Sequence, residues 1–182
     1  MNRAVVKALG IGTDERVLDV GAGMGPATAL AAKAGAHVVA VDPTPFMRFV
    51  SGVRRLGQSA RTRIEILDGA AEHLPVNDAS IDAAWAVNAM HHWVDLDAAI
   101  SQLHRVLRRG GRLLLVDEDF GDPSHPDYER IRARRRKQHL EFADVDPAEV
   151  GAKFATAGFA VNEADTTVLA GRPAKMIRAT KL

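Results

Sequence analysis

A glycine-rich segment, Asp19-Val20-Gly21-Ala22-Gly23-Met24-Gly25, directly follows an apolar run and precedes a helical one. Glycines at alternate positions let the backbone turn sharply and let a ligand lie directly against it. The N–H groups that open the following helix favour a negative part of such a ligand. A tight turn without any ligand explains an isolated segment of this kind about equally well. The dinucleotide fingerprint G-x-G-x-x-G fits poorly, because its sixth position is Pro26 here.

A second acidic residue, Asp42, ends the next apolar run and precedes Pro43. Its two carboxylate oxygens are suited to accept hydrogen bonds from two neighbouring hydroxyls. Taken singly, Asp19 could cap its turn and Asp42 could start one. Because the two acids end successive apolar runs, a shared ligand explains the pair better than two unrelated turns.

His91 and His92 follow the fourth apolar run. Histidine titrates near neutrality and can take a proton from a hydroxyl or an amine. The alternative is that the two rings only shape their loop together with Met90 and Trp93. Other groups that could supply a base or a substrate anchor come later in the chain: Asp117, Glu118, Asp119, His125 and His139.

The elements that must position these groups alternate along the chain. The apolar runs lack polar alternation, which indicates strands buried on both faces of a parallel sheet covered by helices. A turn is predicted at Arg109-Gly110-Gly111, and the helix at 46–56 is basic and amphipathic. The expected strands are 16–20, 37–41, 63–67, 81–87 and 112–116, and the expected helices are 3–9, 26–34, 46–56, 96–107, 128–142 and 147–157.

The last part of the chain departs from this alternation. Two further strands, near 159–169 and 173–181, are separated only by Ala170-Gly171-Arg172. So short a connection predicts an antiparallel hairpin. The fold class is therefore α/β, with a mostly parallel sheet that ends in an antiparallel hairpin.

From Arg16 to Asp119 the chain resembles class I S-adenosylmethionine-dependent methyltransferases, especially the small-molecule group (methyltransferase type 11) that includes the quinone-ring methylases. Besides the glycine-rich loop, the resemblance is carried by Val41–Met47, Gly69–Pro75, Asn88–Trp93 and His104–Gly111. It implies a Rossmann-like, doubly wound sheet of order 3-2-1-4-5-7-6, and residues 1–182 are expected to form one domain. It also implies an enzyme that moves a methyl group from S-adenosylmethionine to a small-molecule acceptor by O-, N- or C-methylation, leaving S-adenosylhomocysteine.

The resemblance assigns roles to individual residues. Asp19 would orient the ammonium group of the cofactor, and Asp42 would accept from both ribose hydroxyls. Met47 would pack on adenine, and Asn88 would bind the methionine end. The full expected cofactor set is Asp19, Gly21, Ala22, Gly23, Gly25, Asp42, Pro43, Met47, Ala70, Ala71, Glu72 and Asn88, and the candidate catalytic residues are His91 and His92.

One position departs from the family pattern. Members often have aspartate where Ala70 stands, and it receives the adenine amino group. Ala70 has no side-chain acceptor, and strand alternation need not aim Asp68 at the same place. Asp68 is therefore left out of the expected set.

Composition limits the remaining classes. With 24 Lys and Arg against 23 Asp and Glu, the net charge gives no argument for nucleic acid or membrane as a partner. The absence of cysteine excludes disulfides and thiolate metal sites and fits a cytoplasmic location. No metal is implied, because histidines and carboxylates do not show a tight metal-ligand spacing. We expect a small-molecule acceptor as partner, no membrane and no nucleic acid, and a homodimer is left open.

The segment 120–146 is expected to be an insert that covers the substrate. It follows the last parallel strand, and it carries a basic cluster from Arg130 to Lys137 that predicts a solvated helix. Two other functions stay open on the sequence: a non-catalytic protein that binds S-adenosylmethionine, and an NAD-dependent oxidoreductase.

Overall fold

The structure is a computed structural model that describes the backbone of residues 1–138 and 145–182, with the side chains of 1–134 and 145–182. Its strands are β1 (Arg16–Val20), β2 (His37–Asp42), β3 (Ile64–Asp68), β4 (Ile81–Val87), β5 (Leu107–Glu118), β6 (Phe159–Leu169) and β7 (Arg172–Lys181). Its helices are α1 (Asn2–Ala8), α2 (Pro26–Lys33), α3 (Pro45–Leu56), α4 (Leu96–Val106), α5 (Tyr128–Gln138) and α6 (Pro147–Thr156), with 3₁₀ turns η1 (Arg61–Arg63) and η2 (Met90–His92).

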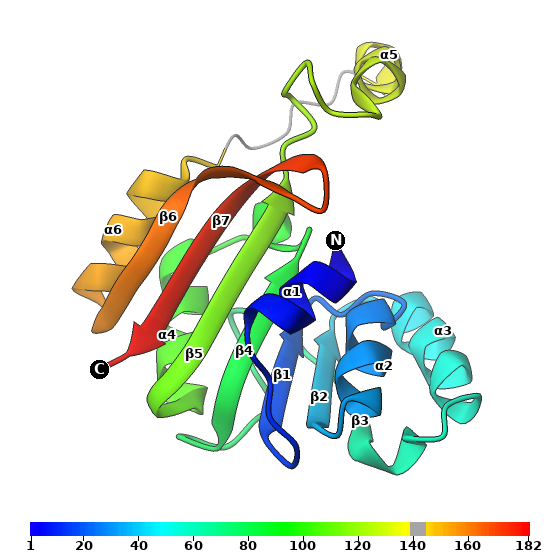
Figure 1. Cartoon of the computed structure of the whole chain (residues 1–182), viewed down its shortest axis with the longest axis vertical. Coiled ribbons are helices and arrows are strands. Elements are labelled where there is room, and N and C mark those ends of the chain that lie inside the picture. The colour runs from blue at the N-terminus through cyan, green and yellow to red at the C-terminus, as the bar shows by residue number, and fades with distance from the viewer. Residues whose placement is uncertain (139–144) are drawn as a thin grey trace.

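The seven strands form one sheet of order β3-β2-β1-β4-β5-β7-β6, as expected (Figure 1). The first five strands are parallel. β7 then pairs antiparallel with β5, and β6 pairs antiparallel with β7. The predicted α/β class, strand order and terminal hairpin are thus confirmed. In a parallel sheet all carboxyl ends lie on one edge, so the segments after β1, β2, β4 and β5 meet there.

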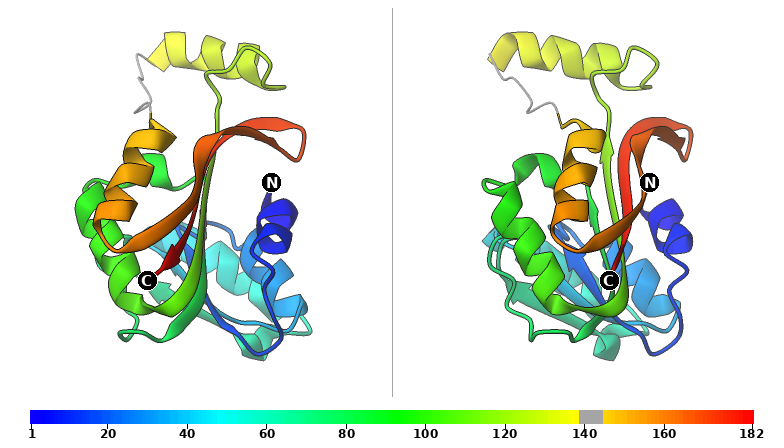
Figure 2. Two further views of the ribbon diagram at one scale, coloured as in Figure 1. Left: turned by 60° about the vertical axis from the view of Figure 1, so that its left-hand side comes forward. Right: turned by 90° about the vertical axis from the view of Figure 1, so that its left-hand side faces the viewer.

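Helices cover both faces of the sheet (Figure 2), and two apolar clusters hold them in place. On one face, residues such as Leu103 of α4 and Phe154 of α6 pack against the sheet. On the other, Val5 of α1 and Ala31 of α2 pack near Trp85 of β4. β4 is buried from Ala83 to Ala86 because it has neighbours on both faces and both sides. Helices on both faces explain why the strands are continuous apolar runs.

β5 begins earlier than the sequence predicted. The turn expected at Arg109-Gly110-Gly111 lies inside the strand, because Leu107 already pairs with Ile81. The register then shifts, and Arg112 pairs with Ala83. The extra residues form an irregularity in which Gly110 adopts φ +74°. Arg109-Gly110-Gly111 thus form a bulge within the strand rather than a loop outside the sheet.

The insert 120–146 leaves the carboxyl edge of the sheet after β5. Figures 1 and 2 show α5 standing apart from the body of the molecule. His139 and the predicted end of this helix at Phe142 lie outside the described residues, as do the side chains of Arg135, Arg136 and Lys137 in the basic cluster. Among the described residues, no helix is long and apolar enough to cross a membrane.

A buried carboxyl group lies at the junction of β1 and α2. Asp19 is 3% exposed, and its Oδ2 accepts a 2.6 Å hydrogen bond from the hydroxyl of Thr28. Burial raises the pKa of Asp19 to about 7, although the Thr28 hydrogen bond acts in the opposite direction. The charge of nearby Asp42 adds to the rise. In an unfolded chain the same group ionises near its ordinary value of 3.8.

This shift predicts how pH changes stability. The folded protein holds the Asp19 proton more tightly than the unfolded chain, so the contribution of this group to stability falls as pH rises from about 4 to about 7. Asp19→Asn keeps an acceptor for Thr28 and removes the titration. Relative to the unmodified protein, the variant should gain up to about 1.4 kcal/mol per pH unit across that window. Urea unfolding at several pH values measures this, with exposed Asp97→Asn as the control. A difference that does not change with pH contradicts the assignment.

Candidate functional site

The loop after β1 turns over the end of β2. The backbone N–H groups of Gly21 and Ala22 both donate to the carbonyl oxygen of Val41, at 2.8 and 3.0 Å. The N–H of Gly23 donates to Oδ2 of Asp42 at 2.8 Å. These contacts join the glycine-rich loop to the residue that ends the neighbouring strand. The structure therefore brings together the two acids, Asp19 and Asp42, that the sequence singled out.

Two positions of the loop, Gly21 and Gly23, have a backbone conformation that favours glycine. Gly21 has φ +68°, and a Cβ there would lie 2.6 Å from the Cβ of Ala89, so the loop passes directly against the segment after β4. Gly23 has φ +55°, and a Cβ there would meet nothing within 4 Å. The first glycine is needed for close packing, and the second leaves backbone uncovered. Gly25, Pro26 and α2 follow directly, so the N-terminus of that helix adjoins this uncovered backbone.

The carboxylate of Asp42 is held on both oxygens. Besides the Gly23 contact on Oδ2, its Oδ1 accepts from the N–H of Thr44 at 2.9 Å. Asp42 is 7% exposed, and Pro43 and Thr44 lead directly into α3. Each carboxylate oxygen can accept more than one hydrogen bond, so the two backbone contacts leave acceptor capacity for hydroxyl groups.

Arg48 of α3 is a residue that sequence reasoning missed. One of its guanidinium nitrogens donates to the backbone oxygen of Asp42 and to Oδ1 of Asp68, each at 2.8 Å. It therefore links the ends of β2 and β3. Asp68 itself is well exposed and engaged with this arginine. The sequence feature that could have indicated this role is the position of Arg48, one helical turn into the helix that follows Asp42.

The segment after β3 lies at the carboxyl edge of the sheet, and its Glu72 side chain binds a neighbouring loop. Ala71 is buried, and Ala70 pairs with His73 in a short bridge. Oε1 of Glu72 accepts from the N–H groups of Val94 and Asp95, at 2.7 and 3.3 Å. Glu72 thus fixes the loop that follows η2. The cofactor contacts expected of Ala70, Ala71, Glu72 and half-buried Met47 stay predictions.

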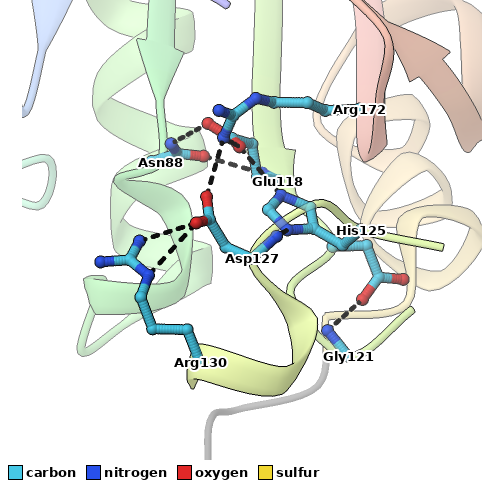
Figure 3. A network of polar contacts seen from close by, with 8 residues as sticks. Asn88, Glu118, Gly121, His125, Asp127, Arg130 and Arg172 are labelled. Atoms are coloured by element: carbon cyan, nitrogen blue, oxygen red, sulfur yellow. Dashed lines mark hydrogen bonds and ion pairs between the residues drawn. The ribbon is translucent and has the colours of Figure 1, made fainter. Parts of the chain in front are cut away.

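Asn88 lies at the end of β4 with φ +53°, a conformation that asparagine tolerates better than most residues. Its side-chain amide donates to Oε1 of Glu118 at 3.0 Å, and its Oδ1 accepts from the backbone N–H of Glu118 at 2.7 Å. The same carboxylate contacts His125 and Arg172 (Figure 3). The Asn88 side chain is therefore engaged with β5, and its expected contact with the methionine end stays a prediction.

Glu118 is the centre of this network. Burial opposes its ionisation, but hydrogen bonds from Arg172, Asn88 and His125 outweigh that effect and hold the pKa of Glu118 below its ordinary value. His125 is buried, and its Nδ1 accepts from the N–H of Asp127 at 3.0 Å. Its proton must then lie on Nε2, which donates to Glu118 at 3.1 Å. The network fixes the first residues of the insert to the carboxyl edge of the sheet.

The two candidate catalytic histidines differ in their surroundings. Nδ1 of His91 lies 2.9 Å from Oδ2 of buried Asp117, which also accepts from the backbone N–H of His91. The other oxygen of Asp117 accepts from the N–H of Ala89. His92 is exposed, and its ring centroid lies 4.0 Å from that of His91. Partial burial, and then the neighbouring His91, lower the pKa of His92.

The arrangement is an edge with three chemical parts: uncovered glycine backbone, two neighbouring carboxylates, and a histidine oriented by a third carboxylate. Within the described residues, no group of three histidine, aspartate or glutamate side chains could hold a metal ion. Such an edge is suited to an extended organic ligand with hydroxyl groups and positive charge, placed beside a proton acceptor.

The sequence is similar to those of known methyltransferases. Residues 18–115 match the family model described as "Methyltransferase domain". An uncharacterized methyltransferase of Mycobacterium tuberculosis is 46% identical over 110 residues, which are 58% of this chain and 42% of that protein. A demethylmenaquinone methyltransferase of Clavibacter sepedonicus is 36% identical over 123 residues, or 68% of this chain and 48% of that protein. The chain thus spans about half the length of the curated relatives it matches.

A solved structure titled a SAM dependent methyltransferase, from Aquifex aeolicus, superposes with a TM-score of 0.76. It is 20% identical, and the match covers 100% of this chain and 89% of that one. This similarity confirms the fold, and the family model covers more than half of the chain. The chain therefore belongs to the methyltransferase-domain family.

Proposed function

We propose that the protein binds S-adenosylmethionine at the carboxyl edge of β1 and β2 and transfers its methyl group to a small-molecule acceptor. The observation that carries this proposal is the pairing of the β1 loop with Asp42, because it sets an uncovered backbone beside a held carboxylate. The family match and the names of the relatives support it. The role proposed for each residue starts from the contacts described above for the carboxylates of Asp19 and Asp42 and for the amide of Asn88.

The residues present fit this cofactor. Asp19 has no cation among its described hydrogen-bond partners, and the charge of Asp42 raises its pKa further. Such a pair of carboxylates favours a ligand that carries positive charge, as the ammonium and sulfonium groups do. Asp42 retains acceptor capacity for the ribose hydroxyls, and Gly23 leaves space above its backbone. No comparable fit supports the oxidoreductase alternative, whose phosphate loop Pro26 also disfavours.

When bound, S-adenosylmethionine supplies an activated methyl group, so the protein mainly aligns the acceptor. Alignment can supply about 7–11 kcal/mol of a reaction barrier. Where the acceptor loses a proton as it is methylated, a base is also needed, and we assign that role to His91. The carboxylate of Asp117 can only accept, so Nδ1 of His91 carries the proton and Nε2 is the basic nitrogen. Asp117 is thus a positioning residue, and exposed His92 is not required.

Two further parts of the proposal, a cover for the acceptor and a cytoplasmic location, have separate support. The Glu118–His125 contact fixes the start of the insert at this edge, which is where a cover for the acceptor would begin. The cysteine-free sequence supports a cytoplasmic location. A non-catalytic cofactor-binding protein is the alternative that a methyl-transfer assay decides.

One prediction of this proposal concerns Asp42. Replacement by Ala should remove charged hydrogen bonds worth about 1.5–3 kcal/mol each and weaken S-adenosylhomocysteine binding by one to a few orders of magnitude. Asp42→Asn should also weaken binding, because its amide group must face one of the two backbone donors, Gly23 or Thr44. Calorimetric titration measures both variants against Asp97→Ala, an exposed carboxylate paired with Lys153. Unchanged affinity in a folded Asp42→Ala protein places the ribose elsewhere.

Another prediction concerns the base. With an acceptor identified by screening for S-adenosylhomocysteine release, His91→Gln should slow methyl transfer by about 10²–10⁴-fold and leave cofactor affinity unchanged. Asp117→Asn should slow it too, but should cost little more in the His91→Gln background, because the two residues act as one unit. His92→Gln serves as the control. Equal losses in the His91 and His92 variants, or additive losses in the double variant, contradict these roles.

A further inference from the structure

Helix α3 presents its apolar side chains to solvent. Phe46, Phe49, Val53 and Leu56 are each at least 55% exposed, although surface helices normally bury such residues. At 100° per residue they fall within an arc of about 80°, so they form one stripe along the helix. Met24, in the glycine-rich loop, is 48% exposed, and its carbonyl oxygen accepts from Arg54 of the same helix. We call Phe46, Phe49, Val53 and Leu56 the α3 stripe.

The opposite face of α3 is polar, and it is the face that packs on the protein. Ser51 is buried, and a Cβ on Gly25 would lie 2.5 Å from its hydroxyl oxygen. Arg48 reaches Asp42 and Asp68, and Arg55 donates to the carbonyl oxygen of Ile64 at 3.0 Å. The apolar stripe therefore cannot turn inward without breaking the contacts that hold the end of β2. Figure 1 shows α3 on the outside of the molecule, at the β3 end of the sheet.

The surroundings of the stripe are positively charged. Residues 43–64 contain five arginines and no aspartate or glutamate. Arg48 pairs with Asp68 and Arg63 with Asp14, whereas Arg54, Arg55 and Arg61 take part in none of the ion pairs of the described residues. The net charge of the whole chain, close to zero, conceals this local excess. Apart from Met24, the other large apolar side chains that are exposed in the described part of the chain stand singly, at Val94, Val168 and Leu182.

We propose that the α3 stripe and its arginines bind an anionic membrane surface. Helices that lie in the headgroup region of a membrane typically have phenylalanine and leucine on one side and arginine along the flanks. Anionic lipid complements the two exposed arginines of this region that have no ion pair, Arg54 and Arg61. A second copy of the chain would be a poorer partner, because a two-fold contact through α3 brings Arg54 of one copy close to Arg54 of the other, with the like charges of both Arg61 residues nearby. This proposal departs from the expectation of no membrane partner, which rested on net charge.

The α3 stripe lies close to the candidate site, so membrane binding would bring that site to the membrane surface. Phe46 follows Asp42 by four residues, so the stripe begins beside the carboxyl edge where the candidate site lies. A membrane bound there would adjoin the glycine-rich loop. The inference itself rests on exposure and charge, and it stands whether or not the site binds S-adenosylmethionine.

Vesicle flotation tests the proposal with the full chain. The protein should float with vesicles of equimolar phosphatidylcholine and phosphatidylglycerol, with a partition coefficient at least about tenfold above that for phosphatidylcholine alone, and high salt should reduce it. Phe49→Ser should lower partition about tenfold and Arg61→Gln about fivefold. The matched controls are Val168→Ser, exposed on β6, and Arg3→Gln on α1. These substitutions are at exposed positions, and thermal unfolding checks that each variant folds.

A second measurement shows which face binds. The chain has no cysteine, so Phe49→Cys and Val168→Cys each accept a single nitrobenzoxadiazole label. Anionic vesicles should shift the emission of the label at 49 to the blue and leave the label at 168 unchanged. The proposal is overturned by equal binding to neutral vesicles, by no binding, or by equal shifts of both labels. It is also overturned by a dimer in vesicle-free solution that Phe49→Ser dissociates, which assigns the stripe to a second copy. Titration of the variants with S-adenosylhomocysteine separates these outcomes from a failure at the cofactor site.

Discussion

The contact that the candidate site depends on most is the pair of backbone hydrogen bonds to the Asp42 carboxylate. The N–H of Gly23 binds one oxygen and the N–H of Thr44 binds the other. Hydrogen bonds to an ionised, mostly buried acceptor are stronger than those between neutral groups. One side chain thus fixes the loop after β1 and the start of α3 together. Since Arg48 and Ser51 extend from that helix to β3 and the loop, the arrangement of this edge follows from Asp42.

Local pattern was enough to predict the frame of the fold. Apolar runs without alternation predicted the parallel strands, and the short Ala170-Gly171-Arg172 connection predicted the hairpin. The glycines and acids that end β1 and β2 predicted a ligand site, and the structure joins the two segments through the hydrogen bond between Gly23 and Asp42. These features are properties of a few consecutive residues, which is why a single sequence contains them. The turn at Arg109-Gly110-Gly111 was misplaced because a bulge and a loop use the same residues.

The side-chain contacts between distant segments could not be predicted in this way. Asn88 binds Glu118, and Glu72 binds the backbone of Val94, over separations of 30 and 22 residues. Which of two adjacent histidines is oriented by Asp117 depends on the pairing of β4 with β5. The amphipathic pattern of α3 was visible, but which face it turns to the sheet is set by Ser51, Arg48 and Arg55. The pattern alone would have placed its apolar face inward.

The central claim is that the carboxyl edge of β1 and β2 holds S-adenosylmethionine, and calorimetric titration of the unmodified protein tests it most directly. S-adenosylhomocysteine and NADH are titrated separately, so that two adenosine-containing ligands of different charge and length are compared. The fit of Asp19, Gly23 and Asp42 predicts one S-adenosylhomocysteine bound per chain and no saturable heat with NADH. Saturable NADH binding without a response to S-adenosylhomocysteine contradicts the account.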